Sequence, residues 1–200
     1  MRTALEHPPT KEKLLEAAQC LMLAKGFAAT TVDEICEQAG LTKGSFFHYF
    51  DSKDHLGDAL LSRFCESSQK MHRGFCADEK DPLKRVYRYI DGAIALAKDP
   101  RMSQGCLLGV FAQEMSQSHP KMRSACKKGF EGWAGHFSAE LAKAKAQYAP
   151  RAAFKPKELA EYLIAVMEGA MILGKARGDM RVMAKHLEHY KAYLRTLFGR

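Results

Sequence analysis

The spacing of the apolar residues constrains the fold of this chain more than any other feature. Over most of the sequence they recur at intervals of three and four, the period of a helix with one buried face. One such stripe begins near Lys11 and ends at Gly26, where glycine is a favoured helix C-cap. No segment shows the convincing alternation of apolar and polar residues that indicates a strand. The pattern predicts an all-α protein.

Helix start and stop signals divide the sequence into about nine helices without an internal repeat. Thr31 and Glu34 form a capping box, Gly40 ends the helix that follows, and Thr42 and Ser52 cap the next two. The expected helices cover residues 11–26, 31–40, 42–50, 52–76, 83–98, 106–115, 120–147, 157–176 and 180–198. We therefore expect a small N-terminal head over residues 1–57 and a helical body over residues 58–200.

Composition narrows the class of protein. Of 200 residues, 46% are apolar and 27% charged, which is enough to bury a core. The net charge of +8 is unevenly placed, because residues 1–80 carry −2 and residues 81–200 carry +10. No stretch has the length and apolarity of a signal peptide or membrane span, so a cytoplasmic protein is expected. Six widely spaced cysteines without a CxxC pair predict reduced thiols, and we expect no metal or cofactor.

The most informative segment is TTVDEICEQAGLTKGSFFHYFDSKDHL, residues 30–56. Two short helices flank Ala39-Gly40-Leu41, which supply a small residue for close helix approach, a glycine for φ > 0 and an apolar plug. Phe46 and Phe50 lie four residues apart and are expected to point into the head. The segment therefore predicts a helix-turn-helix whose third helix projects its polar side chains outward.

The outward side chains suit recognition of DNA. Lys43 can reach guanine acceptors, and Gly44 permits close approach to the duplex. The starts of the second and fourth helices favour anions such as phosphate. The predicted DNA-binding residues are Thr31, Thr42, Lys43, Gly44, Ser45, Phe47, His48, Tyr49 and Lys53. Taken singly, each of these could be a solvated surface residue, and short helix pairs also occur as plain packing motifs; the combined pattern favours double-stranded DNA.

These residues carry a resemblance to the TetR/AcrR family of bacterial repressors, over about residues 10–57. Thirteen positions match the family's usual run: Gly40, Leu41, Thr42, Lys43, Gly44, Ser45, Phe46, Tyr49, Phe50, Ser52, Lys53, Asp54 and Leu56. Phe47 stands where the family usually has Tyr, and Asp33 where relatives often carry Arg. The resemblance implies a homodimeric transcriptional repressor that leaves a palindromic operator when a small-molecule effector binds.

The body is expected to supply a dimer interface and an effector pocket. Two apolar stripes, 159–173 and 183–197, can pack against their copies, with Ala170 and Gly174 allowing close approach; the alternative is that both stripes form the monomer's core. The predicted effector-pocket residues are Phe111, Trp133, Met167 and Met171. Aromatic and methionine residues in a helical bundle are also ordinary core, and the sequence does not separate the two roles.

Cys106 is the strongest single clue to the effector. Gly105-Cys106-Leu107 resembles a subgroup of the family, in which Gly-Cys-Leu opens the sixth helix, that includes repressors responsive to electrophiles and oxidants. Independently, a thiol near a helix N-terminus and a cation is activated, and Lys175 or Arg101 could be that cation. The alternatives are a buried, inert thiol, or Cys126 as the reactive one.

A rival function from another class is a helical thiol enzyme that uses Cys106 on electrophiles. No His or Asp stands at a spacing that suggests a partnered base, which disfavours it. We therefore expect a regulator rather than an enzyme.

Overall fold

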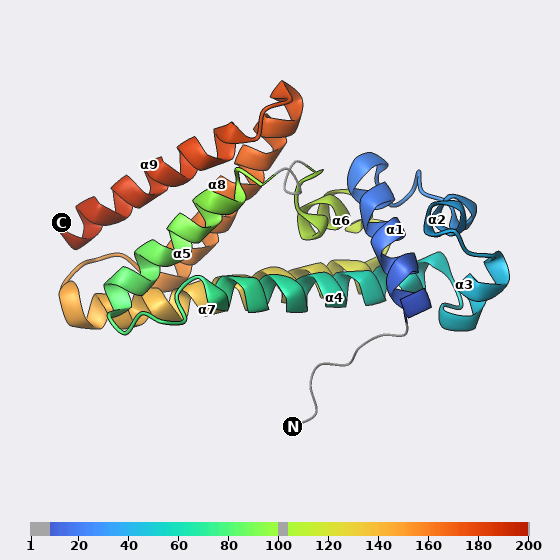
Figure 1. Cartoon of the computed structure of the whole chain (residues 1–200). Helices are drawn as coiled ribbons and strands as arrows, with labels where there is room; N and C mark the ends of the chain where they lie inside the picture. The colour runs from blue at the N-terminus through green and yellow to red at the C-terminus, as the bar shows by residue number, and fades with distance from the viewer. Residues whose placement is uncertain (1–8, 100–103, 200) are drawn as a thin grey trace. The chain divides into compact units, whose positions relative to one another are not determined.

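The computed structural model describes residues 9–99 and 104–199 (Figure 1). Its regular structure there consists of nine α-helices and contains no strand, which confirms the predicted all-α class. In chain order they are α1 (Pro9–Lys25), α2 (Val32–Ala39), α3 (Lys43–Tyr49), α4 (Lys53–Gly74), α5 (Pro82–Leu96), α6 (Leu107–Met115), α7 (Pro120–Tyr148), α8 (Pro156–Arg177) and α9 (Arg181–Phe198).

Local capping chemistry sets several of these boundaries. At α2 the predicted capping box is complete, since the Thr31 hydroxyl accepts from the Glu34 amide and the Glu34 carboxylate accepts from the Thr31 amide. The helix stops at Gly40, whose φ of 65° is left-handed. Asp81 caps α5 through the Lys84 amide, and a proline follows at the first helical position.

The helices divide into two compact units. The first contains the chain up to Phe64 together with Leu107–Cys126, so α6 and the start of α7 belong with α1, α2, α3 and the start of α4. Its interior is built from fully or almost fully buried side chains: Leu14, Leu15, Ala18, Met22, Ile35, Phe46, Phe50, Leu56, Leu60 and Phe111. The predicted boundary at residue 57 separates a DNA-binding part from an effector-binding and dimerisation part. The compact units do not test this functional boundary, so it stays a prediction.

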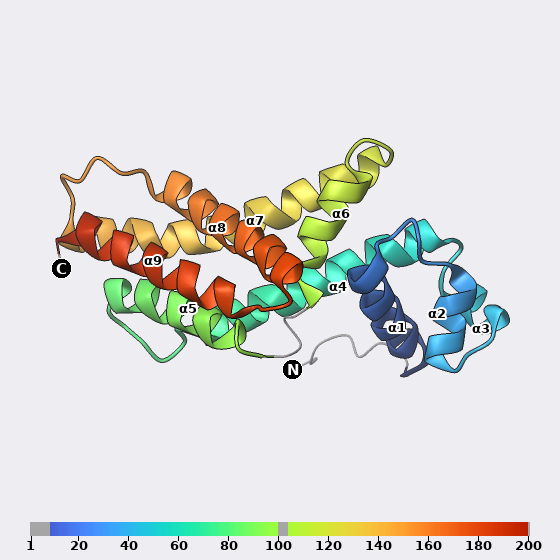
Figure 2. The same ribbon diagram turned by 90° about the horizontal axis from the view of Figure 1, so that it is seen from above.

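The second unit contains Cys65–Cys106 and the chain from Lys127 onward. In it α8 runs beside α9, and α9 also packs on α5 (Figure 2). Most of the two apolar stripes of α8 and α9 lie in this core, as the monomer-core alternative requires; the buried members are Leu159, Leu163, Ala170, Met183, Leu187, Tyr190 and Leu194. Gly174 also packs internally, because a Cβ there would meet the Met180 sulfur at 2.5 Å.

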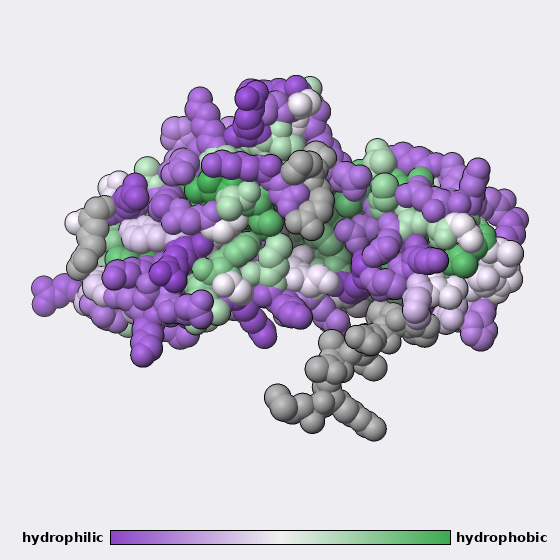
Figure 3. All heavy atoms as spheres, in the orientation of Figure 1, coloured by the Kyte–Doolittle hydropathy of each residue, from purple (hydrophilic) through white to green (hydrophobic). Residues whose placement is uncertain are grey.

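Polar residues cover much of the face drawn in Figure 3, with apolar residues scattered among them. Among the described helices, none is long and apolar enough to cross a membrane.

Candidate nucleic-acid interface and effector site

The helix-turn-helix is formed by α2, the turn at Gly40 and α3. Seven-residue α3 is too short to be stable alone, so its packing must hold it in place. Phe46 and Phe50 do this: they are 0% and 1% exposed, with ring centroids 5.6 Å apart. The Thr42 hydroxyl caps the helix by accepting from the Ser45 amide at 3.1 Å. The inward and outward faces of α3 are thus those that the sequence predicts.

Most of the predicted DNA-binding side chains of α3 reach solvent. Thr42, Lys43 and His48 are exposed, and the Phe47 ring is 55% exposed although it is apolar. Ser45 and Tyr49 are half-buried. The Ser45 hydroxyl also forms a hydrogen bond with the Thr42 hydroxyl at 3.1 Å. An exposed aromatic ring on this face is available for apolar contact with a thymine methyl group.

Lys43 is held by a carboxylate of the neighbouring helix. Its Nζ lies 2.7 Å from Oδ1 of Asp33, which stands in the first turn of α2. The hydrogen bond to Asp33, followed by its negative charge, raises the pKa of the Lys43 ammonium above its ordinary value. Sequence reasoning noticed each residue but did not predict this ion pair.

Lys53, at the start of α4, has a structural partner that the sequence did not reveal. Its Nζ donates to the carbonyls of Phe27 at 2.9 Å and Thr30 at 2.8 Å, and lies 4.4 Å from the centroid of the Phe27 ring. The ammonium therefore ties α4 to the connection between α1 and α2, which we call the α1–α2 connection (residues 26–31).

Glu114 of α6 binds the backbone amides of the same α1–α2 connection. Its carboxylate accepts from the Phe27 and Ala28 backbone at 2.6 and 2.7 Å. Gly26 has a φ of 89°, and a Cβ there would lie 2.8 Å from the carboxylate, so only glycine fits. The Phe27 ring packs edge-on against Phe111 of α6, with centroids 5.7 Å apart. No local pattern could reveal this contact, because its partners are 87 and 86 residues apart.

In the second unit, Cys106 lies beside a carboxyl and near an amine. The residue is 7% exposed, and its thiol hydrogen-bonds to Glu168 of α8, whose pKa is raised by burial. Gly105, at φ 91°, packs against Lys175: a Cβ there would lie 3.3 Å from the lysine Nζ. The structure thus places Lys175 against Gly105, which precedes Cys106 in the chain, while Arg101 lies outside the described residues.

Burial also affects three of the other cysteines. All six are thiols without a disulfide, and burial raises the pKa of Cys36, Cys65 and Cys76, which suppresses the nucleophilic thiolate. Within the described chain, no group of three or more His, Cys, Asp or Glu side chains is placed to hold a metal ion.

The predicted pocket residues are all buried, but they lie in different units. Trp133, Met167 and Met171 are 9%, 2% and 4% exposed in the second unit, whereas Phe111 is fully buried in the first. Trp133 donates from Nε1 to the Tyr89 hydroxyl at 2.7 Å and stacks on His72, with ring centroids 5.6 Å apart. These contacts are those of core residues, and a role in effector binding stays a prediction.

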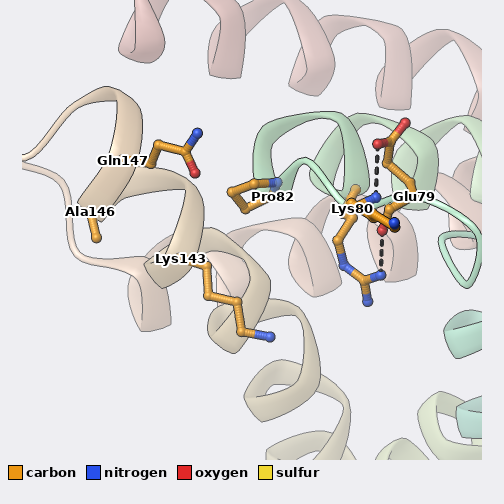
Figure 4. A pocket seen from close by; sticks show the side chains of 7 residues that line it. Glu79, Lys80, Pro82, Lys143, Ala146 and Gln147 are labelled. Atoms are coloured by element: carbon orange, nitrogen blue, oxygen red, sulfur yellow. Dashed lines mark hydrogen bonds between the residues drawn. The ribbon is translucent and has the colours of Figure 1, made fainter.

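Among the open depressions of the second unit are two that charged side chains line. One lies between the start of α5 and the end of α7, where Glu79, Lys80 and Lys143 face it (Figure 4). The buried Glu140 carboxylate already binds Arg85 at 2.7 Å and Lys143 at 3.2 Å, so these cations are not organised for an added anion. The other depression lies at the α8–α9 corner and includes Lys175.

Two family models match the sequence. The model of bacterial regulatory proteins, tetR family, covers residues 14–60, and the tetracyclin repressor-like C-terminal domain model covers residues 82–190. The chain belongs to the TetR family. The match over residues 14–60 contains the helix-turn-helix of α2 and α3. The chain is a DNA-binding transcriptional regulator.

Individual relatives of this chain are also TetR-family regulators. The HTH-type transcriptional repressor DhaR of Mycobacterium sp. is 29% identical over 165 residues, 82% of this chain and 81% of that protein. The HTH-type transcriptional repressor NemR of Escherichia coli is 27% identical over 197 residues, 98% of each chain. Among solved structures, a TetR regulatory protein of Rhodobacter sphaeroides aligns with a TM-score of 0.82 and 25% identity, covering 92% of this chain and 97% of that one.

Proposed function

We propose that this TetR-family chain is a homodimeric repressor that leaves a palindromic operator when an effector binds or when Cys106 is modified. The observation that carries the proposal is the exposed face of α3, presented by a fully capped α2–turn–α3 unit. A helix presented in this way enters the major groove, and a dimer places two such helices about one turn of DNA apart. Such a repressor works in the cytoplasm, and the proposal includes no cofactor and no catalysis.

The proposed DNA contacts separate into two kinds. Lys43, Ser45 and Phe47 reach base edges, while Gly44 lets the backbone approach the duplex closely. The remaining members position the protein on phosphate oxygens; they are Thr31, Thr42, His48, Tyr49 and Lys53. Because the Lys53 ammonium is engaged by the α1–α2 connection, we assign its phosphate contact to the backbone N–H at the start of α4.

Binding to DNA from the region upstream of the protein's own gene tests this proposal. Fluorescence anisotropy of the full chain at several salt concentrations is expected to show a sequence-preferring complex whose affinity falls steeply with salt. Lys43→Ala should weaken binding and alter base preference, whereas Lys157→Ala, which removes an exposed charge from α8, should do neither. A complex with no preference for any upstream sequence would refute the proposal.

We assign the dimer interface to an exposed apolar face of α8 and α9. Tyr162, Ile172, Leu173 and Tyr193 are 50%, 52%, 39% and 45% exposed. The Tyr162 and Tyr193 rings are in contact, with centroids 6.1 Å apart, so apolar side chains of both helices reach solvent together, as at a contact site. Gly169 lies between them on α8, and nothing stands within 4 Å of a Cβ built there. Gly169, rather than the buried Ala170 and Gly174, therefore permits close approach of a second copy.

Sedimentation distinguishes this interface from other arrangements. Gly169→Glu fits the isolated chain and is expected to convert a dimer into a monomer, because it places a charge in the apolar contact. Gly135→Glu is a matched control, since Gly135 of α7 is also exposed with nothing within 4 Å. A Gly169→Glu protein that stays dimeric would rule out this interface.

For the effector we propose electrophiles that alkylate Cys106, as in the Gly-Cys-Leu subgroup. In a Michael addition to a quinone, the sulfur forms a bond to ring carbon and the thiol proton ends on a quinone oxygen. The positive charge of nearby Lys175 favours the attacking thiolate. An adduct on a residue that is 7% exposed cannot be accommodated without movement of its surroundings.

Operator release after treatment with benzoquinone tests the thiol. Wild type and Cys126→Ser should release DNA, and Cys106→Ser should not; equal release by wild type and Cys106→Ser would refute the role of Cys106. Quinone consumption separates a sensor from the rival thiol enzyme. A sensor stops after one adduct per site, whereas an enzyme consumes excess quinone at a constant rate.

A further inference from the structure

The ion pair at the start of the recognition helix is not explained by stability. Asp33 and Lys43 are 65% and 61% exposed, and an ion pair so open to solvent contributes little to folding. Capping of α2 does not require Asp33 either, because Glu34 and Thr31 already form the complete capping box. Asp33 also adds a negative charge to the first turn of α2, where such a charge contributes modestly, but Glu34 stands in the same turn.

A carboxylate in this position is costly for general DNA binding. It neutralises the lysine that approaches the duplex, and it adds a negative charge beside phosphates. The cost is offset only where a base offers a hydrogen-bond donor to the carboxylate. In the major groove these donors are the amino groups of cytosine N4 and adenine N6.

The paired side chains match the groove edge of one base pair. Across a G·C pair, the guanine acceptors N7 and O6 lie next to the cytosine N4 donor. An ammonium in contact with a carboxylate presents the complementary order, a donor beside an acceptor. We propose that Asp33 is a specificity-determining residue that, together with Lys43, reads one G·C pair in each half-site: Lys43 donates to guanine, and Asp33 accepts from the N4 amino group of the paired cytosine.

The pairing predicts an order among the four base pairs at that position. C·G is the worst, because it sets an amino group against the ammonium and two acceptors against the carboxylate. A·T is better than C·G, because adenine offers the acceptor N7 beside the donor N6, but its thymine sets an acceptor towards the carboxylate. T·A keeps the order of acceptor and donor, but thymine offers Lys43 a single acceptor where guanine offers two. The expected order therefore has G·C first and C·G last, with T·A and A·T between them. This inference rests on the proposed role of Lys43 in contacting bases.

Selection from a randomised duplex library with the full-length protein tests the inference, followed by anisotropy on single-position variants of the selected site. Wild type should prefer G·C over C·G at one position of each half-site by about tenfold, within the range of one good bidentate contact. Asp33→Ala should reduce this preference to less than about threefold and tighten binding to random DNA about two- to fivefold. Preferences at the other positions should not change.

Two further variants sharpen the result. Glu37→Ala removes a negative charge from an exposed site one turn along α2 and should keep the wild-type preference. Asp33→Asn keeps the size of the side chain but adds a donor, so it should lose discrimination against C·G, whose guanine O6 and N7 can accept from the amide. It also provides the test if Asp33→Ala does not fold by circular dichroism.

The outcomes separate this inference from the function on which it rests. A wild-type protein that selects no sequence overturns the proposed function itself. A wild type that selects a site, with Asp33→Ala and Asp33→Asn selecting the same bases at every position, overturns the role of Asp33 alone. Equal loss of preference at all positions would also overturn it, because it would show a general effect on the head.

Discussion

Acidification should destabilise the second unit through His72, which is 7% exposed among aromatic rings. Burial, with a smaller effect of the neighbouring His136, lowers the pKa of His72 from 6.5 to about 4. Between these values the unfolded chain binds a proton that the folded chain does not, so stability falls as the pH drops from about 6.5 to about 4. The loss is about 2 kcal/mol at pH 5 and about 3 kcal/mol once the pH is below 4.

Urea unfolding followed by tryptophan fluorescence measures this loss where it arises, because Trp133 is the chain's single tryptophan and stacks on His72. His72→Gln cannot take up the proton, so its free energy of unfolding should change about 2 kcal/mol less than that of wild type between pH 7 and pH 5. His189→Gln changes an exposed histidine of α9 and should keep the wild-type dependence. If His72→Gln loses as much stability as wild type over this range, the buried imidazole is not the cause.

Three other contacts lead to specific predictions for substitutions. Glu114→Ala leaves two backbone amides of the α1–α2 connection without their acceptor, so hydrogen exchange of those amides should accelerate and stability fall by about 2 kcal/mol, whereas Gln113→Ala on the same exposed turn should change neither. Glu140→Ala breaks a buried ion pair with Arg85 and should cost about 3 kcal/mol in urea unfolding. Gly92→Ala should lower the melting temperature although alanine favours helices, because its Cβ would lie 2.3 Å from the Phe75 ring.

The helices could be predicted because their boundaries depend on local chemistry. Thr31, Gly40 and Thr42 act on neighbours within four residues, so the sequence already contains both partners of each cap. The packing partner of an apolar stripe is not local. Size alone favoured Ala170 and Gly174 as interface residues, yet both lie inside the second unit, since helical period defines a face without saying what covers it.

The DNA-binding site shows the same difference between local contacts, which the sequence predicts, and non-local contacts, which it does not. The inward and outward faces of α3 follow from four-residue spacing, and the structure has them as predicted. The partner of Lys53 could not be predicted, because the carbonyls that it binds lie 26 and 23 residues earlier in the chain. A lysine at a helix start is read from sequence as an anion contact, whereas here its ammonium also stabilises the fold of the head.

The contacts of α6 give the proposed thiol sensor a physical route to the DNA-reading helices. Cys106 is joined by one peptide bond to the first residue of α6, and Glu114 stands near the end of this nine-residue helix. We expect the nine residues of α6 to move together, so that an adduct that displaces its first turn also displaces Glu114. The carboxylate grips two successive amides of the α1–α2 connection through charge-assisted hydrogen bonds, and the connection leads directly into the capping box of α2. We therefore expect Glu114→Ala to retain alkylation of Cys106 but to release less operator per adduct than wild type.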